Sequence, residues 1–529
     1  MKILTASQMQ RIDRLTTEQY GVPSLTLMEN AGRGVVEFLV ERLAPLESQR
    51  IAILCGRGNN GGDGMVVARM LRERGLKPRV LLFANPQSVR GDAAANLDRL
   101  TGSGAPEIVE DSQAWQSIRP SLAGTTLFVD ALLGTGLSKP LEVFLLEVVR
   151  DVNASFPAAR VVAVDLPSGI SADTGELIGE HLRADSSVTF TAPKIAHVFP
   201  PACERVGEWL AKPIGTPAEA MEDDPELFLN LTTREDVAWI ARPRKLTAHK
   251  GTYGHVLILA GSVGKTGAAA MAAKAALRAG AGLATIATAQ SALPIIASLG
   301  MEFMTEQLPE TEAGTISLRA TDYGRLDKLV EGKTVLAVGP GIGAVPETAE
   351  LVRMVVNKYP IPVVLDADGL NAFAGCMDAF RADARPPGAT VLTPHPGEMA
   401  RLTGQTTAAI QAHRVEAARE FARKWQVTLV LKGFRTLTAA PDGQVWVNPT
   451  GNPGMATGGT GDVLTGLLAG LLAQHPGRPV PEVAASAVYL HGLAGDLAAE
   501  GFGQASMIAG DLLDAVPRAY KLLAEGRTP

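Results

Sequence analysis

The chain has 529 residues, of which 46% are hydrophobic, 20% are charged and 5% are aromatic. This composition excludes a disordered protein, and the length exceeds what one hydrophobic core normally supports, so we expect two to four domains. The formal net charge of -6, without a block of basic residues, argues against a nucleic-acid-binding protein. Small molecules are therefore the expected partners.

The amino terminus and the cysteines predict a cytoplasmic protein. Residues 1–21 are amphipathic and charged, and lack the apolar core and the cleavage site of a signal peptide. No apolar run is long enough to cross a bilayer, so no membrane partner is expected. The three cysteines form no CxxC pair, which fits a reducing compartment and no structural zinc site.

From Arg50 to about Phe190, short β-branched runs alternate with glycine turns and helical patterns, as in "RIAILCG" before "MVVARMLRERG". This alternation predicts an α/β fold in which crossover helices link parallel strands into a doubly wound sheet. Three loops, "CGRGNNGGDG", "DALLGTGLSKP" and "DLPSG", follow predicted strands. They should meet at the carboxyl edge of the sheet, where such folds bind ligands.

The alternation stops in the acidic, proline-containing stretch "TPAEAMEDDPELFLN" and resumes at "GHVLILAG". We therefore predict two α/β domains, residues 1–220 and 232–529, joined by a linker over residues 221–231. Strands of the second domain again lead into polar or glycine-rich loops, in "KTVLAVGPGIG", "IPVVLDADGLNAF", "ATVLTPHPGEM" and "VTLVLKGFRT".

The glycines of "GRGNNGGDG" permit positive φ angles and close backbone approach, so N–H groups can converge on a phosphate at the start of the next helix. The spacing matches neither a GxGxxG fingerprint nor a P-loop. The alternative is a plain strand-to-helix turn, with Asp63 helping to cap the helix. Asp130 and Asp165 end strands and Ser168 follows, so their oxygens can bind a hard cation, act as acid and base, or cap turns.

"GRGNNGGDG", "DALLGTGL" and "VDLPSG", in this order, resemble the amino-terminal YjeF family, the NAD(P)H-hydrate epimerases, over roughly the first 215 residues. The resemblance implies a Rossmann-like epimerase domain over residues 1–220. It implies Asp165 as a catalytic residue at the nicotinamide ring, and a potassium ion held by Asn60, Asp130 and Ser168. The residues implied to bind the hydrated dinucleotide are Asn59, Asn60, Gly61, Gly62, Asp63, Gly134, Thr135, Gly136, Leu137, Ser138, Lys139, Pro140 and Asp165.

In "GGTGDVLTGLLAGLL", glycines precede an apolar helix with Asp462 in its first turn. N–H groups at such a helix start can stabilise a transferring phosphoryl group while Asp462 takes a proton from a hydroxyl. The alternative role for Asp462 is a simple helix cap. "GSVGKTGAA" looks like a P-loop, but Leu259 stands where the motif requires glycine. We expect Gly261 to Ala268 to wrap a substrate instead.

The order of "GSVGKTGAA", "GPGIG", "DADGLNAF", "TPHPGEM", "LKGFRT" and "GTGDVLTG" resembles the carboxy-terminal YjeF family, the NAD(P)H-hydrate dehydratases of the ribokinase-like superfamily. The resemblance covers about residues 232–520. It implies an ADP-dependent (S)-NAD(P)H-hydrate dehydratase domain over residues 232–529, with Asp462 as the catalytic base. Ala268, Gly341, His395 and Asp462 would contact the hydrate. Lys432, Gly433, Phe434, Arg435, Thr436 and Gly461 would hold ADP.

The two resemblances together imply a bifunctional repair enzyme for hydrated NADH and NADPH. Hydroxide is a poor leaving group. Phosphorylation of the C6 hydroxyl by ADP would release AMP and form a phosphate ester at C6, from which the ring nitrogen can expel phosphate. Magnesium is expected with the nucleotide. Asp366 and Glu398 are candidates for water-mediated contacts to this ion. Alternatively, each of the two could be a helix cap or a surface charge. We also expect a homo-oligomer.

Two other interpretations stay open at this point. One is a small-alcohol kinase, acting on a hydroxymethylpyrimidine or a hydroxyethylthiazole, fused to a nucleotide-binding sensor, because "GTGD" alone permits it. The other is that the first domain is a binding module without activity. The intact Asn60, Asp130 and Asp165 argue against the second interpretation, and "GRGNNGGDG" with "DLPSG" argues against the first.

Overall fold

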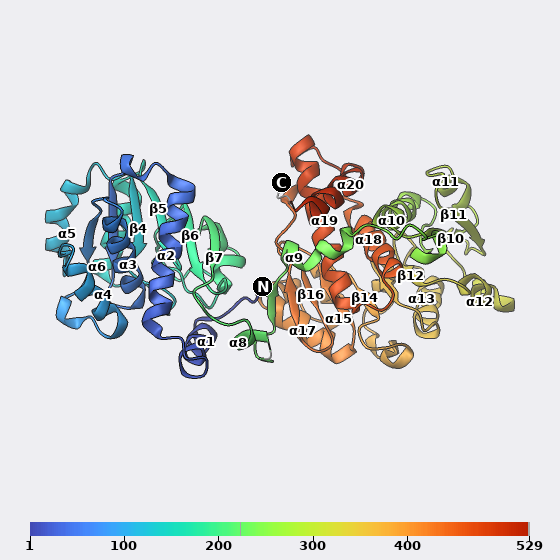
Figure 1. Cartoon of the computed structure of the whole chain (residues 1–529). Helices are drawn as coiled ribbons and strands as arrows, with labels where there is room; N and C mark the ends of the chain where they lie inside the picture. Colours follow the sequence, from blue (N-terminus) through green and yellow to red (C-terminus); the bar gives the residue numbers. More distant parts are fainter. Residues whose placement is uncertain (223, 527–529) are drawn as a thin grey trace. The chain divides into compact units, whose positions relative to one another are not determined.

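The structure is a computed structural model that describes residues 1–222 and 224–526 (Figure 1). The chain divides into two compact units, Met1–Leu227 and Phe228–Pro529, so the division falls inside the predicted linker. Residues 229–231 form a strand of the second unit's sheet. The end of the predicted linker over 221–231 therefore belongs to the second unit, because this short apolar stretch pairs with another strand.

The first unit is built on a sheet of parallel strands in the order β3-β2-β1-β4-β5-β6-β7. The described strands are β1 (Ile51–Cys55), β2 (Arg79–Leu82), β3 (Glu107–Ile108), β4 (Leu127–Ala131), β5 (Arg160–Val164), β6 (Ser186–Phe190) and β7 (Glu208–Lys212). The strand order reverses between β1 and β4, since the chain runs outward from β1 in one direction and from β4 in the other.

Helices cover both faces of this sheet, which confirms the predicted doubly wound α/β class. The helices are α1 (Ala6–Glu18), α2 (Ser24–Leu43), α3 (Asn59–Glu73), α4 (Gly91–Thr101), α5 (Ser112–Ile118), α6 (Val143–Ser155), α7 (Ile195–Val198) and α8 (Glu219–Glu222). Alternate residues of β1 enter two cores, because successive side chains of a strand point to opposite faces. Ile53 packs with residues of α2, α3 and α4, whereas Leu54 packs with Trp115 of α5 and Val148 of α6.

The second unit contains a larger sheet in the order β11-β10-β9-β12-β13-β14-β15-β16-β17-β8. Its described strands are β8 (Leu229–Leu231), β9 (His255–Leu259), β10 (Leu283–Ala289), β11 (Met304–Leu308), β12 (Val335–Val338), β13 (Val363–Leu365), β14 (Thr390–Leu392), β15 (Thr428–Leu431), β16 (Leu437–Ala439) and β17 (Val445–Val447). The pairs β15–β16 and β16–β17 are antiparallel and the other pairs are parallel. The order reverses between β9 and β12.

Twelve α-helices are described in the second unit, and α18 lies on the sheet against β9, β12 and β13. They are α9 (Arg234–Val237), α10 (Thr266–Ala279), α11 (Leu293–Ala297), α12 (Arg325–Val330), α13 (Pro346–Lys358), α14 (Asp368–Asn371), α15 (Pro396–Thr403), α16 (Thr407–Ala412), α17 (Arg414–Trp425), α18 (Thr460–Gln474), α19 (Val480–Phe502) and α20 (Ala509–Glu525). In neither unit does a described helix have both the length and the apolarity to cross a membrane.

The glycines of "LTGLLAGLL" allow α18 to lie close to α10. A Cβ atom on Gly466 would lie 2.1 Å from the Ala272 carbonyl oxygen, and one on Gly470 would lie 2.4 Å from the Ala276 carbonyl oxygen. Both distances are far below contact distance, so any larger residue would push the two helices apart. This packing fixes where the first turn of α18, with Asp462, meets the sheet.

Candidate active sites

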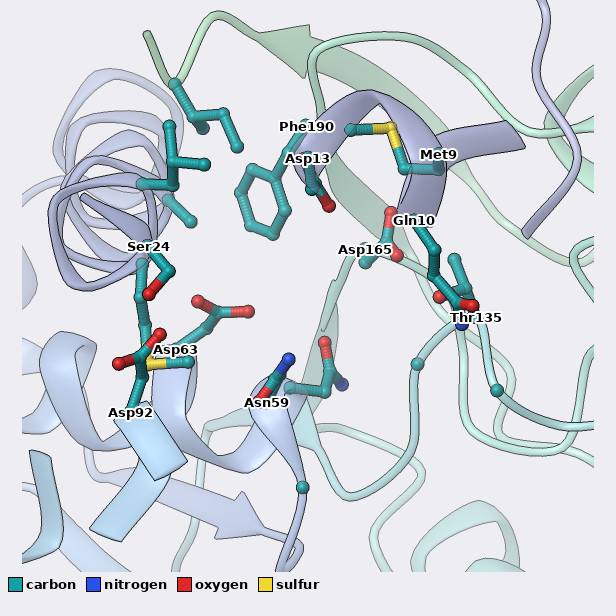
Figure 2. Close-up of a pocket in the computed structure, with 18 of the residues that line it drawn as sticks. Met9, Gln10, Asp13, Ser24, Asn59, Asp63, Asp92, Thr135, Asp165 and Phe190 are labelled. Atoms are coloured by element: carbon teal, nitrogen blue, oxygen red, sulfur yellow. The ribbon is translucent and has the colours of Figure 1, made fainter. Parts of the chain in front are cut away.

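A cavity of about 700 Å³ opens in the first unit at the carboxyl ends of β1 and β4, where the strand order reverses (Figure 2). Ligands of open α/β sheets bind at this position. Of the residues implied to bind the dinucleotide, those that line the cavity are Asn59, Asn60, Asp63, Gly134, Thr135, Gly136, Leu137 and Asp165. Gly61 and Gly62 lie on the same turns but do not line it, and Ser138, Lys139 and Pro140 continue the loop beyond it.

The glycine-rich run is the start of a helix rather than an open loop. Helix α3 begins at Asn59 and Gly58 occupies its N-cap position, so Asp63 lies in the second turn, buried, and does not cap the helix. Glycine permits a positive φ, but none of the glycines of the run adopts one. Close backbone approach is the real requirement, because a Cβ on Gly61 would lie 1.8 Å from the Gly56 carbonyl oxygen. The amino terminus of α3, with its positive dipole end, thus borders the cavity.

Asp165 follows β5 and forms a buried ion pair with Lys194. The Lys194 ammonium lies 2.8 Å from Asp165 Oδ1, and the Thr189 hydroxyl donates to the same oxygen at 2.7 Å. Burial alone would raise the pKa of Asp165, but the Lys194 charge and these hydrogen bonds lower it below the ordinary value. Asp165 is therefore a stable carboxylate in the cavity wall.

His197 holds the backbone around this pair. Its Nδ1 accepts from the Lys194 N–H at 3.1 Å, and its Nε2 lies 3.0 Å from the Asp165 carbonyl oxygen. Burial and the Lys194 charge lower the pKa of His197 to about 4, so the ring is neutral and Nε2–H is the donor. Asp165 has a φ of 64°, a left-handed conformation that this hydrogen bond helps to maintain. The sequence analysis found neither Lys194 nor His197.

Two further carboxyl groups line the same cavity. Burial raises the pKa of Asp63 well above its ordinary value, and the charges of Asp165 and Asp13 add to the effect. Burial likewise raises the pKa of Asp13 to about 6, although the Lys194 charge partly offsets it. Asp13 was missed because α1 precedes every recognised motif. Its position, four residues after the buried Met9 on an otherwise apolar helix face, was the available signal.

The three residues implied to hold potassium lie together around Leu133. Ser168 donates through Oγ and through its backbone N–H to the two oxygens of Asp130, both at 2.7 Å. The Asn60 side chain donates to the Leu133 carbonyl oxygen at 2.9 Å, and the Leu133 N–H donates to Ser168 Oγ at 2.9 Å. Burial raises the pKa of Asp130 to about 6 despite its hydrogen bonds. Amide, carbonyl, hydroxyl and carboxylate oxygens are the donors that a hard cation requires, so the set fits potassium.

In the second unit, a cavity of about 380 Å³ lies beside the amino terminus of α18. All six residues implied to hold ADP line it: Lys432, Gly433, Phe434, Arg435, Thr436 and Gly461. The opposite wall comes from residues 448–453 and from α19. His491 of α19 also lines the cavity, and its Nε2 lies 2.9 Å from the Thr460 carbonyl oxygen. The sequence analysis overlooked His491 because no glycine motif surrounds it.

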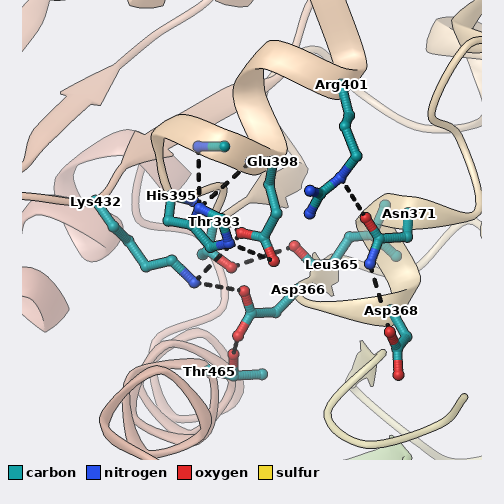
Figure 3. Close-up of polar contacts among 11 residues, drawn as sticks. Leu365, Asp366, Asp368, Asn371, Thr393, His395, Glu398, Arg401, Lys432 and Thr465 are labelled. Carbon is teal, nitrogen blue, oxygen red and sulfur yellow. Dashed lines mark hydrogen bonds and ion pairs between the residues drawn. The ribbon is translucent and has the colours of Figure 1, made fainter. Parts of the chain in front are cut away.

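A second buried ion pair lies next to this cavity (Figure 3). Lys432 contacts Asp366 Oδ1 at 2.8 Å, and the Thr465 hydroxyl of α18 donates to Asp366 Oδ2 at 2.7 Å. Burial alone would raise the pKa of Asp366, but the Lys432 charge and these hydrogen bonds lower it. Asp366 is 2% exposed, which excludes the surface charge considered for it; Glu398 is also buried, 3.8 Å from Lys432 Nζ.

Asp462 lies in the first turn of α18, close to the ion pair but not part of it. A Cβ on its neighbour Gly461 would lie 3.5 Å from Lys432 Nζ and 3.7 Å from Asp366 Oδ2. The N-cap of α18 is Gly459, so Asp462 is not the cap. Burial raises the pKa of Asp462 to about 6, with a further contribution from Asp366 and an opposing one from Lys432. A carboxylate with this pKa is well matched to proton transfer near neutral pH.

The other predicted hydrate-binding residues of the second unit are Ala268 in the first turn of α10, Gly341 in the loop after β12 and His395 at the N-cap of α15. Ser262 Oγ donates to the Gly341 carbonyl oxygen at 2.7 Å, which joins the loop after β9 to the loop after β12 at the reversal of strand order. Gly341 has a φ of 60°, and a Cβ there would lie 3.2 Å from the Ala268 Cβ. His395 caps α15, since its Nδ1 accepts from the N–H groups of Gly397 and Glu398.

Two α/β units, each with a cavity at the carboxyl edge of its parallel strands and a buried Asp–Lys pair beside that cavity, point to an enzyme with two sites. Family models match both units: residues 24–196 match the YjeF-related protein N-terminus and residues 256–518 match NAD(P)H-hydrate dehydratase. Relatives match the chain over almost its full length. The chain belongs to the family of bifunctional NAD(P)H-hydrate repair enzymes.

Two of these relatives are named bifunctional NAD(P)H-hydrate repair enzyme Nnr. The protein of Moorella thermoacetica is 44% identical over 527 residues, which cover 99% of this chain and 98% of the relative. The protein of Escherichia coli K12 is 32% identical over 513 residues, with coverages of 97% and 93%. A solved ADP/ATP-dependent NAD(P)H-hydrate dehydratase from Bacillus subtilis, co-crystallized with ATP and magnesium, is 33% identical with a TM-score of 0.48, covering 56% of this chain and 98% of that chain. The family membership does not favour the small-alcohol kinase.

Proposed function

We propose that the chain repairs hydrated nicotinamide nucleotides in two steps. The first unit interconverts the R and S hydrates of NADH and NADPH, and the second unit dehydrates the S form with ADP as phosphoryl donor. The observation that carries the proposal is a cavity that all six predicted ADP ligands line, among them Gly461, the neighbour of Asp462; a Cβ on Gly461 would lie 3.5 Å from Lys432 Nζ and 3.7 Å from Asp366 Oδ2.

In the first unit, the hydrated dinucleotide would occupy the cavity of about 700 Å³, with its phosphates at the amino terminus of α3 and its ring at Asp165. The predicted ligands of the dinucleotide are residues 59–63 and residues 134–140. Asn60, Asp130 and Ser168 would hold potassium, which when bound supplies a positive charge near the start of α3. The Asp165 carboxylate would stabilise positive charge on the ring when the C6 hydroxyl leaves.

In the second unit, Asp462 would accept the proton of the C6 hydroxyl as that oxygen attacks the terminal phosphorus of ADP, with AMP as the leaving group. The ring nitrogen would then expel phosphate from C6, and loss of a C5 proton would restore the dihydronicotinamide. Lys432, the rest of the 432–436 loop and Gly461 would hold ADP, while Ala268, Gly341 and His395 would hold the hydrate.

Magnesium, when bound with the nucleotide, would neutralise charge on its phosphates. Asp366 and Glu398 are the carboxylates nearest to Lys432, 2.8 Å and 3.8 Å from its Nζ, and both offer the oxygen ligands that magnesium takes through water. They therefore fit the predicted role of water-mediated contacts. The homo-oligomeric state and the cytoplasmic location remain predictions from the sequence.

The test is recovery of NADH absorbance from a mixture of R and S hydrates supplied with ADP and magnesium. We expect both epimers to be consumed, the R form faster than it epimerises spontaneously, with AMP and inorganic phosphate as products. Consumption of the S form alone would leave the first unit without the proposed activity. A stable phosphorylated alcohol, without NADH, would support a small-alcohol kinase instead.

A further inference from the structure

Asp13 of α1 projects into the cavity of the first unit and has no assigned role. Its Oδ1 atom is buried without a hydrogen-bond partner, although buried carboxylate oxygens are ordinarily bonded. Figure 2 shows Asp13 and Asp165 on one side of the cavity and Asp63 and Asp92 on the other. An unbonded carboxyl oxygen beside a substrate-sized cavity is placed to bond a ligand rather than the protein.

The surroundings of Asp13 and Asp165 divide two tasks between them. Asp165 carries the Lys194 ammonium at 2.8 Å and the Thr189 hydroxyl at 2.7 Å, which stabilise its ionised form and make it a poor proton donor. Asp13 has neither contact, and burial raises its pKa to about 6, with the Lys194 charge opposing this shift and the Asp165 charge adding to it. Acid–base catalysis by two carboxyl groups usually has this arrangement, in which one group keeps its charge while its neighbour exchanges a proton.

The charged groups that line the cavity together with Asp13 come from several elements. They are Arg14 and Glu18 of α1, Arg57 before α3, Asp63 of α3, Asp92 of α4, Asp165 after β5 and Lys194 before α7. Asp63 lies on the other side of the cavity from Asp165, and burial raises its pKa well above the ordinary value.

We propose that Asp13 is the proton donor and acceptor of the epimerase site, and that Asp165 stabilises the cationic intermediate. This assignment rests on the proposed epimerase function. Asp13 gives its proton to the C6 hydroxyl, the C6–O bond breaks to release water, and the lone pair of N1 forms a double bond to C6. In the reverse direction, water adds to either face of C6 and the Asp13 carboxylate takes its surplus proton. The proton and the water are both recovered, and no redox change occurs.

The experiment measures epimerisation by full-length protein carrying Asp13→Asn, with Asp98→Asn as the matched control. Asn keeps the shape of Asp but cannot exchange the proton, and Asp98 is an exposed carboxylate on α4 outside the cavity. We expect kcat to fall about 100-fold or more in the Asp13 variant with little change in KM, and no change in the Asp98 variant. Asp13→Glu should recover part of the activity.

Two readouts separate proton transfer from a structural role. In the wild type, kcat/KM corrected for the spontaneous rate should fall as the pH rises above about 6, because the protonated form of Asp13 starts the reaction. This dependence should be absent from Asp13→Asn. Epimerisation in water labelled with a heavy oxygen isotope should also place the label at C6, and the variant should slow both processes equally.

Wild-type epimerisation together with an unchanged kcat in a folded Asp13→Asn protein would overturn the assignment and leave the proposed function standing. Wild-type epimerisation without incorporation of label would overturn the mechanism of C6–O cleavage. A wild-type protein that does not accelerate epimerisation would overturn both the assignment and the proposed epimerase function. A slowed reaction in an Asp13→Asn protein whose melting temperature is not lowered supports the assignment.

Discussion

The two units contain the same buried ion pair in the same position but present it differently. Asp165 follows β5 and Asp366 follows β13, and each lies 2.8 Å from a lysine ammonium. In the first unit, Lys194 and Thr189 both contact Oδ1 of Asp165, and Asp165 lines the cavity. In the second unit, Lys432 contacts Oδ1 of Asp366 and Thr465 contacts Oδ2. A carboxylate in a cavity wall can meet a substrate, whereas one bonded at both oxygens positions its neighbours.

Each unit also holds a second carboxyl group with a pKa near 6, Asp13 in the first and Asp462 in the second. In both cases burial is the main cause and the ionised partner Asp adds to it. The comparison therefore predicts that each ion pair sets the electrostatic environment and that the second carboxyl group moves the proton. Substitutions at Asp13, Asp165 and Asp462 and at the two lysines test this division.

The largest effect is expected from Asp462→Asn. Loss of the general base should lower the dehydration rate by about 10²–10⁴-fold, because Asn has no proton-accepting carboxylate. Epimerisation by the same protein should be unchanged. The measurement is formation of NADH from purified S hydrate with ADP and magnesium, alongside Asp514→Asn, which changes an exposed carboxylate on α20. Full dehydration by Asp462→Asn would remove Asp462 as the base.

Asp165→Ala should slow epimerisation by a factor similar to, or smaller than, the one expected for dehydration by Asp462→Asn. We expect epimerisation to fall at least about 100-fold because the cavity loses its fixed negative charge and Lys194 loses its partner. Dehydration of purified S hydrate should continue at the wild-type rate. The R-to-S conversion rate of the variant measures the effect, and a normal rate would revive the interpretation of the first unit as a binding module.

Removal of either buried lysine should destabilise its own unit. Lys432→Met leaves Asp366 buried and charged without its partner, which costs about 3–5 kcal/mol in comparable buried pairs. Lys194→Met should cost less, because Asp165 lines the cavity, where water can reach its carboxylate. Unfolding by denaturant, followed with a probe in each unit, measures both values.

Exposed ion pairs supply the matched controls for the lysine variants. Lys358 pairs with Asp327 in the second unit, and Arg150 pairs with Glu180 in the first. Lys358→Met and Arg150→Met should each cost no more than about 1 kcal/mol, because water solvates the partner that remains. Equal costs for Lys432→Met and Lys358→Met would contradict a structural role for the Asp366 pair.

The fold and the loops after the strands that line the cavities could be predicted because they follow local rules. β-branched runs before glycine loops indicate parallel strands, and polar residues at strand ends then fall at one edge of the sheet. The sequence could not supply Lys194 as the partner of Asp165, since the two lie 29 positions apart and meet only when β6 pairs with β5. The same holds for Lys432 and Asp366, which reach each other across β13, β14 and β15.

Backbone geometry was the other feature that the sequence alone could not predict. Glycine permits both positive φ and close approach, and the sequence alone does not say which the fold uses. In "GRGNNGGDG" the fold uses only close approach, since the run folds into the first turns of α3 against Gly56 and Leu132. Asp63 is therefore a buried residue of the cavity wall, which excludes the alternative role of helix cap.

The smallest expected effect is on stability, and its sign follows from the raised pKa values. Asp13 has a pKa of about 6 in the folded protein and an ordinary value near 3.8 when unfolded. Below about pH 4 the Asp13 carboxyl group is protonated in both the folded and the unfolded state, so it does not lower the free energy of unfolding. As the pH rises to 6, the unfolded state ionises first, so the folded state loses stability relative to it, and above 6 the cost is constant.

Asp13→Asn removes this cost and should stabilise the first unit by about 1–2 kcal/mol at pH 7, after allowance for partial solvent screening of a shift that corresponds to roughly 3 kcal/mol. The gain should vanish below about pH 4. Asp462→Asn should behave in the same way in the second unit, since its pKa is raised to the same value. Denaturant unfolding at several pH values measures the gain, and a stabilisation that does not depend on pH would show that packing, rather than the buried charge, limits stability at these sites. If the gain in stability depends on pH in both units, each site contains a carboxylate that lowers the stability of its own unit. Such a loss of stability is expected of a group that is retained for proton transfer.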